Sequence, residues 1–329
     1  MKFLGSEIAP LGMGCWPIGG PMFAGEQSVG YTNADDAESV RTIHAGLDAG
    51  ITLFDTAAAY GAGHSERLLG QALKGREALV VTKIGIAIDE ASKQITGAET
   101  APETVIPAID RSRARLDRDC IDLVLLHQNS LPVAEAELIF DQLDRARADG
   151  KIGAYGWSTD FTASVSAMAG RDGFVAVEHA MNLFVEAKNM QGLIDETGLV
   201  AMLRSPLAMG LLSGKYGADS VMPEGDIRAT PLLEWASYFQ GGRVNPEMLG
   251  QLDAVRDLLT VGGRSLVQGA LGWLWAKRAD NIPIPGARTV EQIEGLAGAL
   301  RFGPLPSDVM AQIEALIPRD PSDAEDRER

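Results

Sequence analysis

Four side chains of the kinds used in proton transfer follow apolar segments at separate places in the chain. They are Asp55, Tyr60, Lys83 and His127. Tyrosine is a poor acid near neutral pH, with an ordinary pKa of about 10, and a nearby lysine cation lowers that value. A carboxylate can hold the lysine in place, and a histidine beside the phenol can orient a carbonyl or share its proton. Together they would protonate a carbonyl oxygen as it becomes an alkoxide.

Each of these groups lies where a short apolar run ends. Residues 51–66, ITLFDTAAAYGAGHSE, are typical of a strand, a loop and the start of a helix. Taken alone, Asp55 is equally well explained as part of a turn. Polar residues also follow later apolar runs, namely Ser158, Thr159, Glu178, Asn182, Arg204 and Arg288. In a barrel, the ends of these strands would meet on the face where barrel active sites lie.

A repeated strand–helix unit is expected to position these side chains. The expected strands are residues 11–15, 52–54, 79–82, 121–126, 153–157, 174–177, 199–203 and 281–284, and the main helices are residues 34–49, 65–73, 102–116, 133–148, 162–169, 187–196 and 265–278. The strands are continuous apolar runs, as in a parallel sheet buried on both faces. Eight such strands predict a closed (β/α)8 TIM barrel. A doubly wound open sheet is the alternative, although no GxGxxG follows a first strand.

The remaining segments lie outside this repeat. Residues 2–9 predict a β-hairpin that plugs one end of the barrel. Residues 211–263, after the seventh strand, form a long excursion with one clear helix at 246–259, which favours a functional lid. Further helices are expected at 289–300 and 307–316. We therefore expect one catalytic domain over residues 1–318 and a disordered charged tail over 319–329.

Composition excludes several classes of function. The chain has 329 residues, of which 46% are hydrophobic and 22% charged, as is usual for a soluble globular enzyme. The net charge of −16 argues against nucleic acid or an anionic membrane as a partner. We expect a cytoplasmic protein, because no apolar run approaches the ~20 residues of a membrane span. The scattered histidines and two cysteines predict no metal site, and oligomeric state cannot be read from the sequence.

Several motifs together resemble the aldo-keto reductase family. They are FDTAxxYG, VVTK, LVLLH, GWS, SPLAMGLLSGKY and IPGARTVEQIE, and the resemblance extends from the N-terminal hairpin to about residue 300. It implies a (β/α)8 barrel that binds NADP(H), or sometimes NAD(H), without a Rossmann domain. It also implies hydride transfer between nicotinamide C4 and the carbonyl carbon of a small aldehyde or ketone, or the reverse oxidation of an alcohol or sugar.

The resemblance also implies a role for individual residues. Tyr60 would be the general acid in reduction and the base in oxidation, Lys83 would lower its pKa with Asp55 as partner, and His127 would orient the carbonyl. The cofactor would be held at its carboxamide by Ser158 and Asn182, at its pyrophosphate by Ser205, Leu207, Gly210 and Lys215, and at its adenosine ribose by Gly286, Arg288 and Gln292. Arg288 beside a helix N-terminus suits a 2′-phosphate. Trp16, in the first strand-end loop, is expected to line the substrate pocket.

Four positions depart from the family pattern. Thr159, Glu178, Met181 and Leu296 stand where the family often has Asn, Gln, an aromatic residue and Asn. Glu178 would bring a negative charge near the carboxamide, and Met181 would pack on the nicotinamide as a flexible thioether. Two alternatives stay open. One is a cofactor-binding, redox-sensing regulatory subunit with little turnover, and the other is a barrel lyase with a Schiff base at Lys83.

Overall fold

A closed parallel barrel forms the centre of the molecule. The computed structural model describes residues 1–230 and 237–328. Its parallel strands are β3 (Met13–Gly14), β6 (Leu53–Asp55), β7 (Leu79–Ile84), β10 (Ile121–Leu126), β11 (Ile152–Ser158), β12 (Phe174–Ala180), β13 (Val200–Arg204) and β16 (Ile282–Pro283), which are neighbours in that order. The two ends of the sheet meet, because the amide of Gly14 donates to the carbonyl of Pro285 at 3.0 Å. The (β/α)8 prediction is confirmed, and the open sheet is not found.

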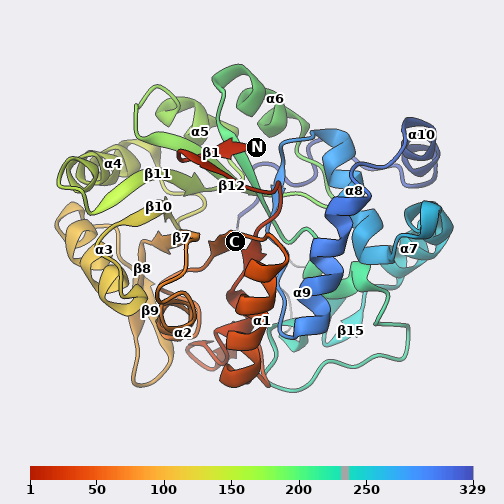
Figure 1. The fold of residues 1–329 in the computed structure, drawn as a ribbon, viewed down its shortest axis with the longest axis horizontal. Coiled ribbons are helices and arrows are strands. Elements are labelled where there is room, and N and C mark those ends of the chain that lie inside the picture. Colours follow the sequence, from red (N-terminus) through yellow and green to blue (C-terminus); the bar gives the residue numbers. More distant parts are fainter. Residues whose placement is uncertain (231–236, 329) are drawn as a thin grey trace.

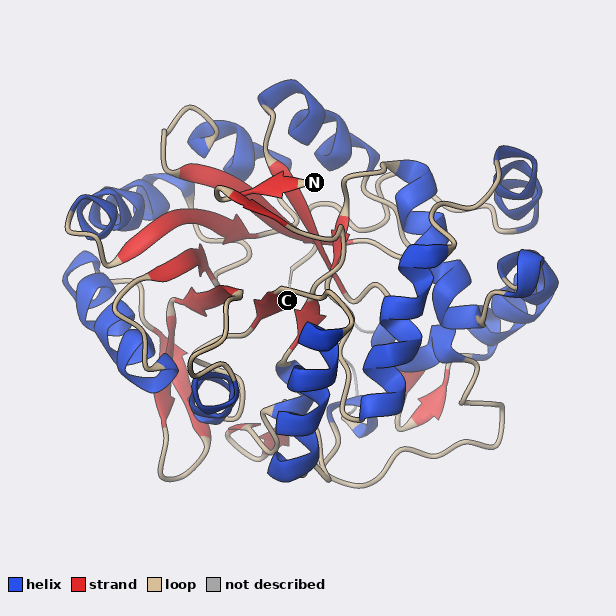
Figure 2. Cartoon of the chain, in the orientation of Figure 1, coloured by secondary structure: helices blue, strands red, loops and turns tan. Residues whose placement is uncertain are grey.

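Helices alternate with the strands and cover the outside of the barrel (Figures 1 and 2). They are α1 (Asp36–Asp48), α2 (His64–Ala72), α3 (Pro102–Leu116), α4 (Val133–Ala148), α5 (Thr162–Met168), α6 (Lys188–Thr197), α7 (Pro246–Leu259), α8 (Leu266–Lys277), α9 (Val290–Ala297) and α10 (Ser307–Leu316). Side-chain caps explain several starts, including Asp35 on α1 and a Ser265–Gln268 capping box on α8. The expected helix at 289–300 ends earlier, and a 3-10 turn (Gly298–Arg301) follows it.

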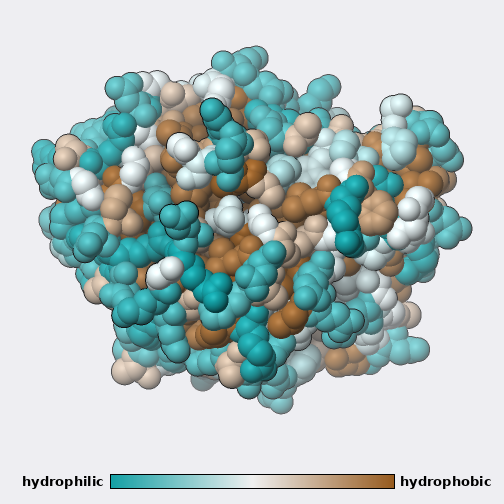
Figure 3. All heavy atoms as spheres, viewed as in Figure 1, coloured by the Kyte–Doolittle hydropathy of each residue, from teal (hydrophilic) through white to brown (hydrophobic). Residues whose placement is uncertain are grey.

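The barrel interior has an apolar end where the strands begin. Along each strand, side chains that point into the barrel alternate with side chains that face the helices, as the two-residue period of a strand requires. Leu53, Leu79, Val81, Leu123, Leu125, Ala154, Ala176, Met202, Ile282 and Ile284 form this cluster. The N-terminal hairpin, β1 (Lys2–Phe3) with β2 (Ser6–Glu7), contributes Phe3, and Ile8 follows it into the same cluster. On the face drawn in Figure 3, hydrophilic residues cover the helices, and apolar side chains are visible in the furrows between them.

Two loops at the opposite end of the barrel form a small sheet that the sequence did not reveal. The loop after β3 contains β4 (Phe23–Ala24) and β5 (Gln27–Ser28), and the loop after β7 contains β8 (Ile86–Asp89) and β9 (Gln94–Ala98). They pair in the order β5-β4-β9-β8. The segment 211–263 contains 3-10 turns, the short hairpin β14 (Phe239–Gln240) with β15 (Arg243–Val244), and α7. Within residues 1–230 and 237–328, no helix combines the length and apolarity needed to cross a membrane.

The charged C-terminal segment, which we expected to be disordered, lies against the rim of the barrel. The amide of Ala324 donates to the carbonyl of Glu186 at 2.8 Å, and that of Asp326 donates to the carbonyl of Asp160 at 2.9 Å. The Glu325 carboxylate accepts hydrogen bonds from the backbone and side chain of Asn189 at 2.6 and 2.8 Å. Partners distant in sequence therefore position this segment, and its composition alone does not reveal them.

Candidate active site

Three of the four predicted proton-transfer residues contact one another where the strands end. Asp55 is the last residue of β6, Tyr60 follows in the turn, and Lys83 lies near the end of β7. The Lys83 Nζ atom lies 2.7 and 2.6 Å from the two Asp55 carboxylate oxygens and 3.2 Å from the Tyr60 hydroxyl. It also donates to the carbonyl of Thr56 at 3.1 Å. The lysine thus links the carboxylate to the phenol.

A second carboxylate also contacts this lysine. Glu178 Oε2 lies 3.1 Å from Lys83 Nζ, and Glu178 Oε1 accepts a hydrogen bond from Ser158 Oγ at 3.1 Å. Asp55, Lys83 and Glu178 are all almost fully shielded from solvent, with at most 3% of each side chain exposed. The sequence identified Glu178 as a departure near the carboxamide but did not indicate its contact with Lys83. The available signal was its strand position, two residues after the inward-facing Ala176.

Burial and charge shift the pKa of each member of this cluster. Burial raises the pKa of Asp55 well above its usual range, the charge of Glu178 raises it further, and Lys83 opposes both. Burial lowers the pKa of Lys83, but the nearby charges of Asp55 and Glu178 outweigh it and raise that pKa above its ordinary value. Lys83 therefore remains an ammonium, held between two carboxylates.

The phenol of Tyr60 differs from expectation in the direction of its shift. Burial raises the pKa of Tyr60, Lys83 lowers it, and the charges of Asp55 and Glu178 raise it again, so that the net direction is upward. Lys83 acts in the expected sense, but it does not dominate. The phenol consequently stays protonated at neutral pH.

Two aromatic side chains surround the Tyr60 ring. His127 follows β10, and its ring meets that of Tyr60 edge-on, with centroids 6.1 Å apart at an angle of 88°. Trp16 begins a 3-10 turn (Trp16–Ile18) after β3 and stacks on Tyr60, with centroids 5.9 Å apart and planes inclined by 19°. The structure therefore places all four proton-transfer candidates and Trp16 around one point at the barrel mouth.

The residues expected to hold the carboxamide lie on adjoining strands. Ser158 ends β11 and Asn182 lies just beyond β12, and both are fully buried. The Asn182 side-chain amide donates to the carbonyl of Ser205 at 3.0 Å and to the hydroxyl of Tyr238 at 2.8 Å, and its oxygen accepts from the amide of Phe184. Asn182 thus ties the end of β13 to the long segment that follows it, and Ser158 is next to Glu178.

The residues expected around the pyrophosphate lie in a tight turn after β13. Ser205 and Gly210 have left-handed φ angles of 53° and 97°. Leu207 precedes a 3-10 segment (Ala208–Ser213) that contains Gly210, and Lys215 is exposed beyond it. In a left-handed turn, successive backbone N–H groups point in one direction, and this arrangement can bind an anion. The neighbouring Arg204 is paired with Asp160.

The residues expected at the adenosine end gather at the N-terminus of α9. Thr289 caps this helix, and the Gln292 side chain accepts a hydrogen bond from the Arg288 amide at 2.9 Å. The Arg288 guanidinium donates to the carbonyl of Thr32 at 3.0 Å, which holds it across the loop after β3. Gly286 lies against Pro17, where an added Cβ would be only 2.5 Å from the proline ring. A cation at a helix N-terminus suits a phosphate group.

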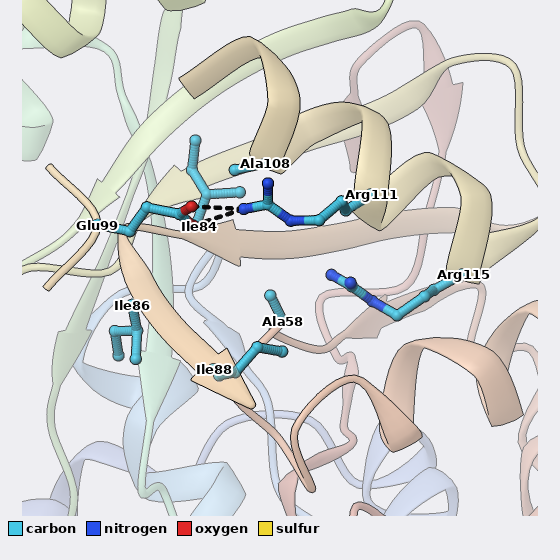
Figure 4. A pocket seen from close by; sticks show the side chains of 8 residues that line it. All are labelled: Ala58, Ile84, Ile86, Ile88, Glu99, Ala108, Arg111 and Arg115. Carbon is cyan, nitrogen blue, oxygen red and sulfur yellow. Dashed lines mark hydrogen bonds and ion pairs between the residues drawn. The ribbon is translucent and has the colours of Figure 1, made fainter. Parts of the chain in front are cut away.

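A small cavity between α3 and the β8–β9 hairpin lies apart from this chemistry (Figure 4). It has a volume of about 10 Å³ and is lined by Ala58, Ile84, Ile86, Ile88, Glu99, Ala108, Arg111 and Arg115. Arg111 crosses it to pair with Glu99 at 2.6 Å. This volume holds about one water molecule, so the cavity is no substrate site.

The described residues contain no group of three His, Cys, Asp or Glu side chains placed to hold a metal ion.

Comparisons with known proteins identify the family of the chain. The model of the aldo/keto reductase family matches residues 10–318. The aldo-keto reductase YhdN of Bacillus subtilis is 29% identical over 301 residues, covering 89% of this chain and 85% of that protein. The glycerol dehydrogenase AKR11B4 of Gluconobacter oxydans has a similar structure, with a TM-score of 0.79, 28% identity and coverage of 95% and 94% of the two chains.

A more distant structure supports the fold alone. The aldo-keto reductase of Klebsiella pneumoniae, solved in complex with NADPH, matches with a TM-score of 0.70 and 21% identity, covering 97% of this chain and 95% of that one. The chain therefore belongs to the aldo/keto reductase family, whose members are NAD(P)H-dependent oxidoreductases that act on carbonyl and alcohol groups.

Proposed function

We propose that this protein transfers a hydride between nicotinamide C4 of NADP(H) and the carbonyl carbon of a small aldehyde or ketone, or catalyses the reverse oxidation of an alcohol or sugar. NAD(H) is the second candidate cofactor. The supporting observation is the 3.2 Å contact between Lys83 Nζ and the Tyr60 hydroxyl, in a group that also contains Asp55. A phenol with this partner, at the mouth of a barrel, is suited to exchange a proton with a carbonyl oxygen.

The residues around the mouth fit such a cofactor. The Ser158 hydroxyl contacts Glu178, which in turn contacts Lys83, and the Asn182 amide contacts the left-handed turn that begins at Ser205. Such a turn suits an anion, and Arg288 lies at a helix N-terminus. The similar Klebsiella pneumoniae structures were solved with NADPH, or with NADP and acetate. The bound nicotinamide supplies the hydride in reduction and accepts it in oxidation.

The chain's own residues supply the proton. In reduction, Tyr60 donates its phenolic proton to the carbonyl oxygen as negative charge develops there. Lys83 stabilises the phenolate that remains, because its ammonium lies 3.2 Å from the oxygen. His127, which meets the Tyr60 ring edge-on, orients the carbonyl, and Trp16 forms a wall of the pocket beside the phenol. In oxidation, the phenolate takes the proton back from the alcohol.

The geometry also weighs against a lyase. A Schiff base requires a neutral amine as nucleophile. Lys83 is instead held as an ammonium by Asp55 and Glu178, whose charges raise its pKa despite burial. This pairing favours an electrostatic role for Lys83 over a covalent one.

The test compares two conservative changes of tyrosine. Tyr60→Phe should lower NADPH consumption with a reactive aromatic aldehyde by about 10³-fold, a loss typical of removing a general acid, and should leave the Kd for NADPH nearly unchanged. Tyr155→Phe is the matched control, because Tyr155 is a buried phenol whose hydroxyl bonds Asp144 away from the mouth. Retained turnover in Tyr60→Phe would contradict the proposal. A wild-type protein that binds NADPH but consumes none with a carbonyl panel would instead favour the redox sensor.

A further inference from the structure

Glu178, the second carboxylate in contact with Lys83, lies close to where the cofactor is proposed to bind. Glu178 lies between two parts of the site, because one oxygen contacts Lys83 Nζ at 3.1 Å and the other accepts from Ser158 Oγ at 3.1 Å. Lys83 belongs to the proton-transfer group, and Ser158 is proposed to hold the nicotinamide carboxamide. The Glu178 side chain is only 2% exposed, so water screens its charge weakly.

The charges around Glu178 do not balance. Its neighbours are Ser158 on β11, Met202 on β13, Lys83 from β7 and Asp55 from β6, and the Tyr60 hydroxyl also contacts Lys83. Among the described residues, Lys83 is the cation in contact with both carboxylates. The ionised trio therefore carries one net negative charge, whereas glutamine at position 178 would leave it neutral.

The nicotinamide ring is a cation when oxidised and neutral when reduced. A net negative charge beside the ring therefore stabilises the oxidised form and leaves the reduced form almost unaffected. We propose that Glu178 is a specificity-determining residue that shifts cofactor binding towards the oxidised form. This inference rests on the proposed function, because it needs the nicotinamide at Ser158 and Asn182.

Protonation of Asp55 should make the preference for the oxidised cofactor depend on pH. Burial, and next the charge of Glu178, hold the pKa of Asp55 above its ordinary value, so Asp55 binds a proton more readily than an isolated carboxylate does. At lower pH that proton neutralises the excess charge. At higher pH Asp55 has lost that proton, and the preference for the oxidised cofactor should be greater.

Equilibrium binding tests this inference without turnover. The Kd values for NADP⁺ and NADPH should be measured at pH 6 and 8.5 for the wild type, Glu178→Gln, Glu178→Asp and Glu137→Gln. At pH 8.5, Glu178→Gln should raise the ratio of the Kd for NADP⁺ to the Kd for NADPH by about tenfold, a modest effect for a buried unit charge near a cation. Glu178→Asp, which keeps the charge, should retain most of the wild-type preference.

Controls separate the inference from the proposed function. Glu137 is exposed on α4, so Glu137→Gln removes a distant charge and should leave the ratio unchanged. An unaltered ratio in Glu178→Gln with both cofactors still bound would overturn the inference alone, as would an equal change in Glu137→Gln. A wild-type ratio that is higher at pH 8.5 than at pH 6 would also overturn it, and this measurement needs no variant. A protein that binds neither form would contradict the proposed function itself.

Discussion

The two ends of the barrel interior are built from the same strands but by opposite means. Leu53 and Asp55 are two residues apart on β6, and Val81 and Lys83 are two residues apart on β7. In each pair the first side chain joins the apolar cluster and the second joins the charged cluster, and all four are almost fully buried. One strand thus supplies packing at the end where it begins and chemistry at the end where it stops.

This difference shows where the fold gains stability and where it gives stability up. At the apolar end, where the strands begin, burying apolar surface stabilises the fold by roughly 25 cal/mol per Å². At the mouth, two anions and one cation are removed from water, which is tolerated only because they are paired. Lys83 is the group on which this pairing depends, since both Asp55 and Glu178 contact it.

The largest expected effect on stability comes from removing that cation. Lys83→Met should lower the free energy of unfolding by about 4 kcal/mol, because two buried carboxylates lose their partner. Urea unfolding at pH 8 measures it, and the loss should shrink at pH 5 as the carboxylates take up protons. Lys151 pairs with Asp110 in a more exposed position, so Lys151→Met should cost at most about 1 kcal/mol. Equal losses in the two variants would contradict this account of the mouth.

A substitution at the apolar end of the barrel should lower stability without the pH dependence expected at the mouth. Leu123→Ala should lower the free energy of unfolding by about 3 kcal/mol, since it leaves a cavity in the apolar cluster. The same urea experiment at pH 5 and 8 should give equal losses, because no titrating group is involved. The kcat of the folded variant should stay near that of the wild type. A strongly pH-dependent loss would mean that the two ends are not energetically separate.

The smallest of these effects is expected at the rim. Arg288→Ala should weaken NADPH binding by about tenfold and NADH binding much less, because only NADPH carries the 2′-phosphate that a guanidinium can pair with. Direct titration of both cofactors measures the difference. Arg145→Ala, on the outer surface of α4, is the matched control. Equal losses for NADPH and NADH would show that Arg288 does not contact the 2′-phosphate.

Much of this arrangement could be predicted because it is local in sequence. Strand-ending positions identified Asp55 and Lys83, and eight apolar runs favoured the closed barrel while leaving an open sheet as the alternative. The contact between Glu178 and Lys83 could not be predicted, since it depends on how far side chains reach across the barrel interior. The upward shift of the Tyr60 pKa likewise depends on tertiary burial and two carboxylates, whereas the sequence suggested only the opposing lysine.

Other features were missed because their signals are weak or distant. The strands β4 and β5 are two residues long, and so short a segment has no readable periodicity. The C-terminal segment looked disordered by composition, yet Glu325 bonds Asn189 and Ala324 bonds Glu186. Such pairings between distant residues are decided only when the chain has folded.

The most direct test of the central claim is the pH dependence of kcat/KM for alcohol oxidation. If Tyr60 is the proton-transfer group, its phenol must lose a proton before it can act as a base, and its pKa is raised above the ordinary value of about 10. We predict that kcat/KM for oxidation rises into the alkaline range with no inflection near pH 6.5. An inflection near pH 6.5 that disappears in His127→Gln would contradict the claim and assign the proton to the imidazole.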